Sequence, residues 1–202
     1  MSRKAKLRRM YDTTSAFYDD LYEKEQVRKF EAISRCVDLS FPKDGVVLDA
    51  GCGTGLITQR LQSLRRFIVG VDFSEGMLKR AKERLRERNT DFVLSDIERL
   101  PFRSKSFDLI LCLTVLQNCN PLKALKSLLK VLTNKGLLVL SYFKRSKNMA
   151  LIESLLDNHI LRDVDTTDNV LILNRRAISI LKRARDKKVL VKSYGLSGQG
   201  VA

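Results

Sequence analysis

The chain alternates short runs of apolar residues with longer stretches in which apolar positions recur every three or four residues. The short runs have the length of buried strands, whereas the longer spacing is typical of helices that cover a sheet. This alternation predicts one α/β domain. The expected strands are Val46–Ala50, Phe67–Val71, Phe92–Leu94, Ser106–Cys112 and Leu137–Phe143, and the helices among them are Leu56–Leu61, Glu75–Arg88 and one that starts at Pro121 and ends at Asn134–Gly136.

Two helices are expected ahead of the first strand. Residues Met1–Arg9 form a basic arm that we expect to be mobile, and the first helix begins at Tyr11. Tyr11, Tyr18 and Tyr22 fall on one stripe of this helix at spacings of seven and four residues. A second leading helix is expected over Val27–Val37.

The region after the fifth strand has weaker patterns. A helix is expected over Met149–Asn158, and a basic helix over Ala177–Lys188. Between them, Leu161–Val164 and Val170–Leu173 are separated by polar turn residues, which predicts an antiparallel pair at the edge of the sheet.

The first apolar run breaks into glycines at every second position, Gly51, Gly53 and Gly55. Glycines at such a turn let the backbone take positive φ and let a ligand lie directly against the chain. The dinucleotide fingerprint would need its third glycine at position 56, which is Leu56. A small ligand is therefore expected on this turn, but not through the dinucleotide fingerprint.

The glycine turn resembles the first motif of the class I S-adenosylmethionine (SAM)-dependent methyltransferases, because Asp49 stands two positions before the first glycine. The Asp-x-Ser-x-x-Met pattern of Asp72, Ser74 and Met77, after the second strand, resembles the second motif. A carboxylate at that strand end can accept both hydroxyls of a ribose. After the third strand the family places an acid near the adenine amino group, and here that acid is Asp96.

This resemblance, which covers roughly residues 11 to 145, implies a seven-stranded Rossmann-like methyltransferase sheet, mostly parallel with an antiparallel edge and with helices on both faces. It implies a single domain over residues 1–202, divided into an N-terminal helical lid (1–40), a core (41–175) and a basic C-terminal extension (176–202). The cofactor is then SAM. The cofactor-binding residues that the resemblance implies are Asp49, Gly51, Cys52, Gly53, Gly55, Asp72, Phe73, Ser74, Met77, Ser95, Asp96, Ile97 and Leu113.

Charge is the least ordinary property of the chain, at a formal net value of +15. Residues 121–149 contain seven Lys or Arg and no acid, and residues 175–202 contain eight against Asp186. These two stretches therefore carry +7 each, or 14 of the net +15. Such clustering favours a surface that binds a polyanion such as a nucleic acid, although an acidic protein partner or solubility alone would also account for it.

Cysteine and histidine usage indicates the compartment and argues against a metal. The four cysteines form no C-x-x-C pair and His159 is the single histidine, so no metal site is expected. The apolar surroundings of Cys36 and Cys112 favour a reducing compartment, and we expect a cytoplasmic protein. No apolar run is long enough to cross a bilayer, and no secretory signal is expected.

The methyl acceptor is expected beyond the end of the fourth strand, where Gln117 and Asn118 are candidate catalytic residues. The Asn/Asp-Pro-Pro-aromatic motif of many amine and amide methyltransferases is missing there. The resemblance also implies that the leading Tyr-Asp segment folds over the cofactor, which makes Tyr18 a third candidate, beside the sulfonium.

Three hypotheses about methyl transfer remain open on the sequence, and a SAM-binding protein without catalysis is the remaining possibility. The first is an RNA methyltransferase acting on tRNA or rRNA, and the second is a methyltransferase for a quinone-like or other metabolite. The third is a methyltransferase that needs a small activator subunit, bound along the edge strand Phe92–Leu94.

Overall fold

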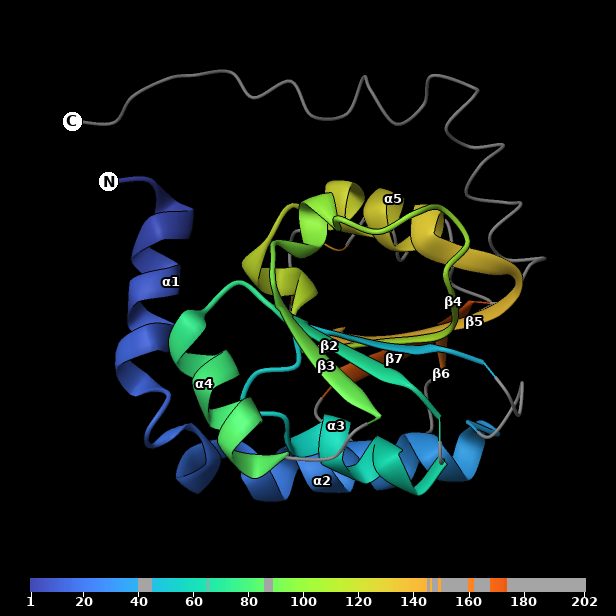
Figure 1. Ribbon diagram of the computed structural model, residues 1–202, viewed down its shortest axis with the longest axis horizontal. Helices are drawn as coiled ribbons and strands as arrows, with labels where there is room; N and C mark the ends of the chain where they lie inside the picture. Colours follow the sequence, from blue (N-terminus) through green and yellow to red (C-terminus); the bar gives the residue numbers. More distant parts are fainter. Residues whose placement is uncertain are drawn as a thin grey trace.

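The structure is a computed structural model that describes residues 1–39, 45–64, 66–85, 89–144, 146, 149, 160–161 and 168–173. One mixed sheet runs through this part of the chain, with its strands in the order β3-β2-β1-β4-β5-β7-β6 (Figure 1). Strands β1 to β5 pair in parallel, whereas β7 is antiparallel to both β5 and β6. Their bounds are Val47–Ala50 (β1), Ile68–Asp72 (β2), Thr90–Leu94 (β3), Phe107–Leu113 (β4), Leu132–Phe143 (β5), Ile160–Leu161 (β6) and Asp168–Leu173 (β7).

The predicted parallel sheet with an antiparallel edge is confirmed. Six of these strands have four residues or more, and β6 contributes two described residues at the edge. The strand order reverses between β1 and β4, and ligands of such folds bind in the crevice beyond the carboxyl ends of the strands at this point.

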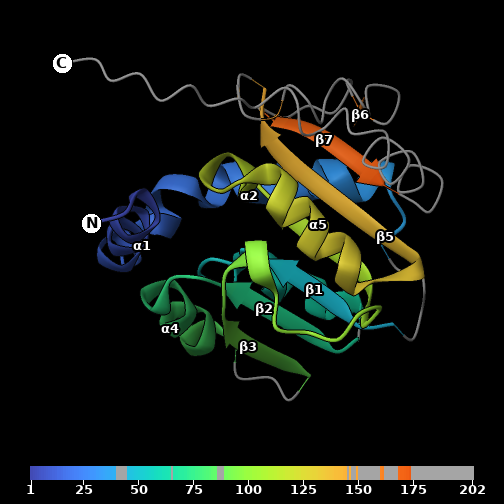
Figure 2. The ribbon, with the colours of Figure 1, turned by 90° about the horizontal axis from the view of Figure 1, so that it is seen from above.

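Helices cover both faces of the sheet (Figures 1 and 2). On one face lie α2 (Tyr18–Cys36) and α3 (Leu56–Leu61), and α5 (Pro121–Val131) lies on the other. Strand β4 feeds both cores, because Ile110 and Cys112 pack with the α5 side while Leu109 and Leu111 pack with the α2 and α3 side. Burial on both faces explains why the parallel strands are continuous apolar runs in the sequence.

Helix α4 (Glu75–Arg84) follows β2 and packs beside the start of α3. A Cβ placed on Gly55, at the N-terminus of α3, would lie 3.0 Å from Cβ of Ala81 in α4. The helix ends four residues earlier than the expected Arg88, with Leu85 as its C-cap, and residues 86–88 lie outside the described ranges.

The expectation of a mobile arm over residues 1–9 was wrong. Residues Arg3–Thr14 form helix α1, whose N-cap Ser2 accepts a hydrogen bond from the Ala5 N–H at 3.2 Å. The single helix expected to begin at Tyr11 is also wrong, because the chain breaks between α1 and α2. The second helix starts at Tyr18 and continues unbroken through the segment expected as a separate helix over Val27–Val37.

Strand β5 begins earlier than the sequence indicated. Helix α5 ends at Val131, and the strand passes through Asn134–Gly136, the segment expected to end the helix. The pairing of β4 with β5 shifts here, since Phe107 pairs with Leu132 but Leu109 pairs with Leu137. The turn-forming residues therefore produce an irregularity inside the strand.

The antiparallel pair at the sheet edge is confirmed by the register of Ile160 with Leu171 and of Leu161 with Val170. The remaining expectations for this end of the chain fall outside the described residues. They are the helices over Met149–Asn158, of which only Met149 is described, and Ala177–Lys188, the strand residues 162–164, and the basic extension over 176–202.

Candidate functional site

The glycine turn after β1 has the backbone geometry that its sequence predicts. All three glycines take positive φ, at 82° for Gly51, 54° for Gly53 and 79° for Gly55. A Cβ on Gly51 would lie 2.4 Å from Val115 Cγ2, so this position has no room for a side chain. By contrast, a Cβ on Gly53 would meet no atom within 4 Å, which leaves open space for a ligand directly above the backbone.

Asp72, at the carboxyl end of β2, faces the same turn. Its Oδ2 accepts a hydrogen bond from the Gly53 N–H at 3.0 Å, and its Oδ1 accepts one from the Ser74 N–H at 2.8 Å. Burial raises the pKa of Asp72 to about 6, although the two backbone hydrogen bonds act in the opposite direction. Each oxygen retains accepting capacity for hydroxyl donors of a ligand.

Asp49 lies beneath the turn and is 3% exposed. The Thr58 hydroxyl donates to its Oδ2 at 2.6 Å, which ties β1 to α3. Burial raises the pKa of Asp49 to about 6, and the nearby carboxylate of Asp72 adds to this shift. The geometry gives Asp49 a supporting position behind the turn.

A pocket opens above the turn, at the carboxyl ends of the strands. The N-terminal helices cover it with Tyr11 from α1 and Tyr18 from α2, whose ring centroids lie 6.3 Å apart. Phe73 continues this aromatic cover, with its ring centroid 5.9 Å from that of Tyr11. The lining residues are Lys4, Tyr11, Tyr18, Gly51, Gly53, Asp72, Phe73, Met77, Ser95, Asp96, Ile97, Leu113, Thr114, Val115, Asn118 and Cys119.

Most of the residues expected to bind the cofactor meet in this pocket. Those that line it are Gly51, Gly53, Asp72, Phe73, Met77, Ser95, Asp96, Ile97 and Leu113. Four others do not line it, which are Asp49, Cys52, Gly55 and Ser74. Ser74 caps α4 by accepting from the Met77 N–H at 3.2 Å. Burial raises the pKa of the Cys52 thiol well above its ordinary value, so this cysteine is not a thiolate.

The three candidate catalytic residues are placed differently. Tyr18 and Asn118 line the pocket, and the Asn118 side-chain amide donates to the Tyr11 hydroxyl at 2.9 Å. Gln117 does not line the pocket, and its side-chain amide donates instead to the backbone carbonyl of Thr114 at 2.6 Å. The geometry therefore favours Asn118 over Gln117 as a group that meets a ligand.

Sequence reasoning missed Lys4, Thr114, Val115 and Cys119 as residues of the pocket. The Lys4 ammonium forms ion pairs with Asp96 and with Glu98, the latter at 2.8 Å, and thereby closes α1 over the end of β3. Ser2, a common N-cap residue, is the local signal that a helix begins there. No local signal predicts Thr114, which has a positive φ of 59° although its side chain is β-branched.

Comparisons with known proteins agree with this geometry. Residues 48–140 match a family model described as a methyltransferase domain. These residues form a class I SAM-dependent methyltransferase domain. The family match also supports SAM, the cofactor predicted from the sequence.

Two curated relatives show the level of similarity. The chain is 30% identical over 148 residues to malonyl-[acyl-carrier protein] O-methyltransferase of Bacillus anthracis, covering 71% of this chain and 54% of the relative. It is 34% identical over 139 residues to demethylmenaquinone methyltransferase of Renibacterium salmoninarum, covering 66% and 57%. The chain spans about half the length of the curated relatives it matches.

Solved structures share the fold of the methyltransferase domain. Magnesium protoporphyrin IX methyltransferase from Synechocystis, with bound SAM, superimposes with a TM-score of 0.67 at 22% identity, covering 87% of this chain and 98% of that one. A Haloferax volcanii methyltransferase, solved in complex with the Trm112 methyltransferase activator, gives a TM-score of 0.57 at 19% identity, covering 65% and 59%. Both similarities concern the fold alone.

The pocket of the methyltransferase domain suits an adenosine-containing ligand. The open space above Gly53, the buried Asp72 carboxylate and the aromatic cover offer a backbone surface, an acceptor for hydroxyls and an aromatic roof. No group of histidines, cysteines and acids that would hold a metal ion occurs among the described residues. None of the described helices is long and apolar enough to cross a membrane.

Proposed function

We propose that this chain transfers the methyl group of SAM to RNA. The observation that carries the RNA acceptor is a set of six exposed cations around α5, which we call the α5 basic surface. None of the six makes an ion pair within the part of the chain that the structure describes. They are Arg99, Arg103, Lys105, Lys123, Lys126 and Lys130.

One end of the α5 basic surface lies close to the pocket along the chain, because Arg99 ends the short helix η2 (Ile97–Arg99). The segment that carries the three members outside α5 is fixed to α5, because the Leu100 N–H donates to Ser127 Oγ at 2.9 Å and the Lys105 N–H donates to the Lys130 carbonyl at 3.0 Å. Ile97, two residues before Arg99, lines the pocket. A polyanion held on this surface would have one end near the pocket, and unpaired cations are the groups that hold phosphates.

The residues of the pocket divide into those that bind the cofactor and those that meet the acceptor. We propose that Asp72 accepts the ribose hydroxyls, Asp96 lies near the adenine amino group, and the backbone of Gly51–Gly55 supports the remainder. When bound, SAM supplies a methyl group already activated by its sulfonium. Tyr18 would place an aromatic face beside that positive charge.

The chain then has to align the acceptor with the methyl group. Such alignment is worth about 7 to 11 kcal/mol in well-oriented reactions, so no acid or base is required for much of the rate. Asn118 is positioned to orient the acceptor, because its amide is already held by the Tyr11 hydroxyl at the pocket wall. Leu113 and Thr114, at the end of β4, complete this side of the pocket.

A second candidate acceptor is a small molecule, which the aromatic cover of Tyr11, Tyr18 and Phe73 favours. Such a cover suits a flat or apolar acceptor. The relatives that act on a malonyl thioester or on demethylmenaquinone support this candidate as analogies. In this case the α5 basic surface would serve an acidic partner or solubility.

A small activator subunit is a further candidate partner. Strand β3 ends one edge of the sheet, and Leu94 on it is 48% exposed. An edge strand with an exposed apolar residue is able to pair with another chain. The Haloferax neighbour, which was solved with an activator, supports this arrangement by analogy. A chain that is monodisperse, stable and active when purified alone would contradict the need for an activator.

We also propose that β6 is the seventh strand of a complete methyltransferase sheet, and that residues 1–40 act as the lid of a single domain. A cytoplasmic location is proposed because all four cysteines are free.

The acceptor is tested by incubating the purified chain with tritiated SAM and either total cellular RNA or a metabolite extract. Label in RNA, together with RNA binding that weakens as the salt concentration rises, supports RNA as the methyl acceptor. Label in the metabolite fraction alone contradicts it. The matched variants are Lys126→Glu/Lys130→Glu on α5 and Lys79→Glu/Lys82→Glu on α4, which change the net charge equally. Log affinity for RNA falls as log salt rises, and the α5 substitutions should make this slope less steep by about 1.4 for single-stranded RNA. The α4 substitutions should leave the slope unchanged.

A further inference from the structure

Thr114 forms the wall of the pocket in an unusual conformation. It follows Leu113, the last residue of β4, and its φ is 59°. A β-branched residue rarely takes a left-handed conformation, since its Cβ crowds the backbone. Such strain persists only where surrounding contacts determine it, and it is concentrated at functional sites.

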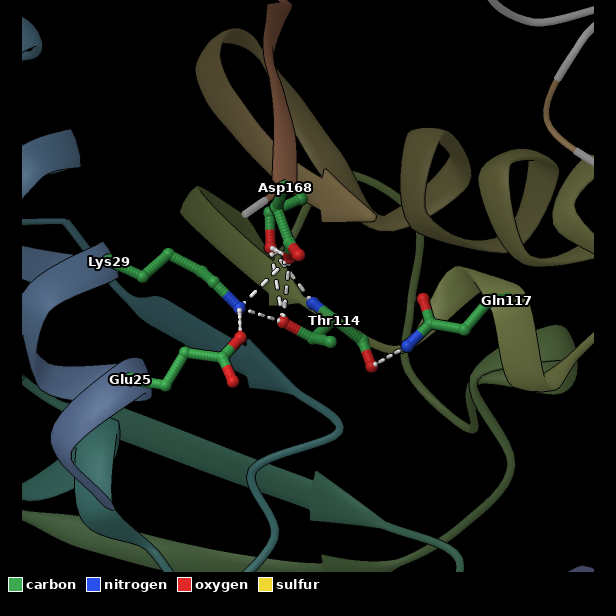
Figure 3. Close-up of polar contacts among 6 residues, drawn as sticks. Glu25, Lys29, Thr114, Gln117 and Asp168 are labelled. Carbon is green, nitrogen blue, oxygen red and sulfur yellow. Dashed lines mark hydrogen bonds and ion pairs between the residues drawn. The ribbon is translucent and has the colours of Figure 1, made fainter. Parts of the chain in front are cut away.

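A buried polar network surrounds this threonine (Figure 3). Lys29 Nζ donates to Thr114 Oγ1 at 2.5 Å, and Asp168 Oδ2 accepts from the same hydroxyl at 2.9 Å. Ser141 Oγ also donates to Asp168 Oδ2 at 2.9 Å, and it accepts from the Thr114 N–H at 2.9 Å. The backbone and the side chain of Thr114 are therefore both fixed.

The network is centred on an ion pair that is shielded from water. Lys29 Nζ lies 2.9 Å from Asp168 Oδ2, and the two side chains are 1% and 0% exposed. Glu25, one turn before Lys29 on α2, adds a second carboxylate at 3.4 Å. Burying two charges is costly, and replacing such a pair by apolar residues often stabilises a protein. Stability alone therefore explains poorly why a charged pair stands here.

The network joins three separate elements, α2, β5 and β7, at the end of β4. Lys29 belongs to α2, Asp168 starts the antiparallel strand β7, and Ser141 lies in β5. Thr114, which they hold, lines the pocket together with Leu113 and Val115. Gln117 fixes the other side of the same residue by donating to its carbonyl (Figure 3).

We propose that Lys29 and Asp168 are positioning residues for the methyl acceptor. Their ion pair holds Thr114 in its left-handed conformation and thereby sets the pocket wall of Leu113, Thr114 and Val115. Neither residue lines the pocket itself. The inference rests on the proposed methyl transfer, because the wall it concerns is the side of the pocket assigned to the acceptor.

The test compares removal of the ion pair in two backgrounds. The variant Lys29→Met/Asp168→Asn removes both charges, so no buried charge is left without its partner. Glycine takes the left-handed conformation without strain, so Thr114→Gly should keep the backbone in place without the network. Hydrogen exchange of the amides of residues 114–119 is measured in the wild type, the pair variant, Thr114→Gly and the combination.

In the otherwise wild-type protein, Lys29→Met/Asp168→Asn should raise the exchange rates of the amides of residues 114–119 by about tenfold or more. In the Thr114→Gly background, the same two substitutions should change these rates by less than about threefold. Amides of β1 and β2 serve as the internal control and should not change. The proposal would be overturned if the two substitutions raised these exchange rates equally in both backgrounds. It would also be overturned if they left the exchange rates of residues 114–119 unchanged. If the pair variant fails to fold, the single variant Asp168→Asn is measured in the same two backgrounds.

A second readout is transfer of label from tritiated SAM to total RNA. The pair variant should lower transfer at saturating SAM by about tenfold while calorimetric SAM affinity stays within about threefold of the wild type, because misplacing an acceptor slows the reaction. Thr114→Gly should restore part of the rate in the pair variant. Equal losses of SAM affinity and of transfer would indicate a merely structural role. If the wild type labels no RNA, the proposed function fails, and the exchange measurement still decides the role of the pair.

Discussion

Asp72 links the glycine turn after β1 to the N-cap of α4, because its Oδ2 accepts from the Gly53 N–H at 3.0 Å while its Oδ1 accepts from the Ser74 N–H at 2.8 Å. The end of β2, the glycine turn after β1 and the start of α4 are therefore held by one carboxylate. Since this carboxylate also lines the pocket, its charge state affects both the shape of the floor and the binding of a ligand.

The first prediction concerns the removal of this charge. Asp72→Asn should weaken the binding of SAM by at least about tenfold, because hydrogen bonds to a charged acceptor contribute roughly 1.5 to 3 kcal/mol. Isothermal titration calorimetry measures the affinity. Asp91→Asn, an exposed position on β3, makes the same chemical change away from the pocket and should bind like the wild type. Equal affinities for the wild type and both variants would show that the Asp72 carboxylate does not contribute to the binding of SAM.

The second prediction is a pH dependence of SAM binding. Burial raises the pKa of Asp72 to about 6, so the carboxyl is mostly protonated at pH 5 and mostly ionised at pH 7. Ribose hydroxyls donate to the ionised form, and the affinity should therefore increase as pH rises through about 6. In Asp72→Asn this rise should disappear. A rise that persists in this variant would assign the titration to Asp49, whose pKa burial also raises to about 6.

The sequence predicted the pocket floor well because its signals are local. Positive φ at Gly51, Gly53 and Gly55 and an acid at the end of β2 follow from residue types at fixed short spacings. The central strands β1, β2 and β4 were equally clear, since burial on both faces makes each of them a mostly apolar run.

The features that the sequence could not predict depend on contacts between distant segments. Helix α1 is held against the body by Lys4 with Asp96 and by Asp12 with Ser74, and a basic run gives no local sign of either contact. The left-handed Thr114 opposes its own intrinsic preference, so only the surrounding network accounts for it. Tertiary contacts override local propensity at both places.

The third prediction separates folding from ligand binding at two neighbouring glycines. Gly51→Ala should lower the free energy of unfolding by roughly 2 to 4 kcal/mol, because the new Cβ would lie 2.4 Å from Val115 Cγ2 in addition to its left-handed strain. Gly53→Ala should lower it by only about 1 kcal/mol, the strain alone. Chemical denaturation measures both values.

The substitution of Gly53 should weaken the binding of SAM much more than it lowers the free energy of unfolding. The methyl group of Gly53→Ala projects into the open space of the pocket, so a protein that remains largely stable should lose most of its affinity for SAM. Unchanged affinity in Gly53→Ala would show that the cofactor does not lie against this part of the turn.

The last prediction concerns how α1 is attached to α4. Asp12 Oδ1 accepts from Ser74 Oγ at 2.6 Å and from the Gly76 N–H at 3.0 Å, and a Cβ on Gly76 would lie 2.8 Å from the Asp12 carbonyl oxygen. Gly76→Ala should therefore push α1 away, even though alanine favours α4 itself by up to about 1 kcal/mol. Trypsin should cleave after Arg8 and Arg9 several times faster in this variant.

The control for this variant is Lys82→Ala, an exposed change on the same helix at a side chain that forms no hydrogen bond or ion pair with α1 among the described residues. Its cleavage rate after Arg8 and Arg9 should match that of the wild type. Saturating SAM should slow cleavage in the wild type and in the control, because Tyr11 and Lys4 of α1 line the pocket and a bound ligand would contact both helix and floor. If Gly76→Ala is cleaved no faster than the control, the contact between Asp12 and the start of α4 does not hold α1 in place.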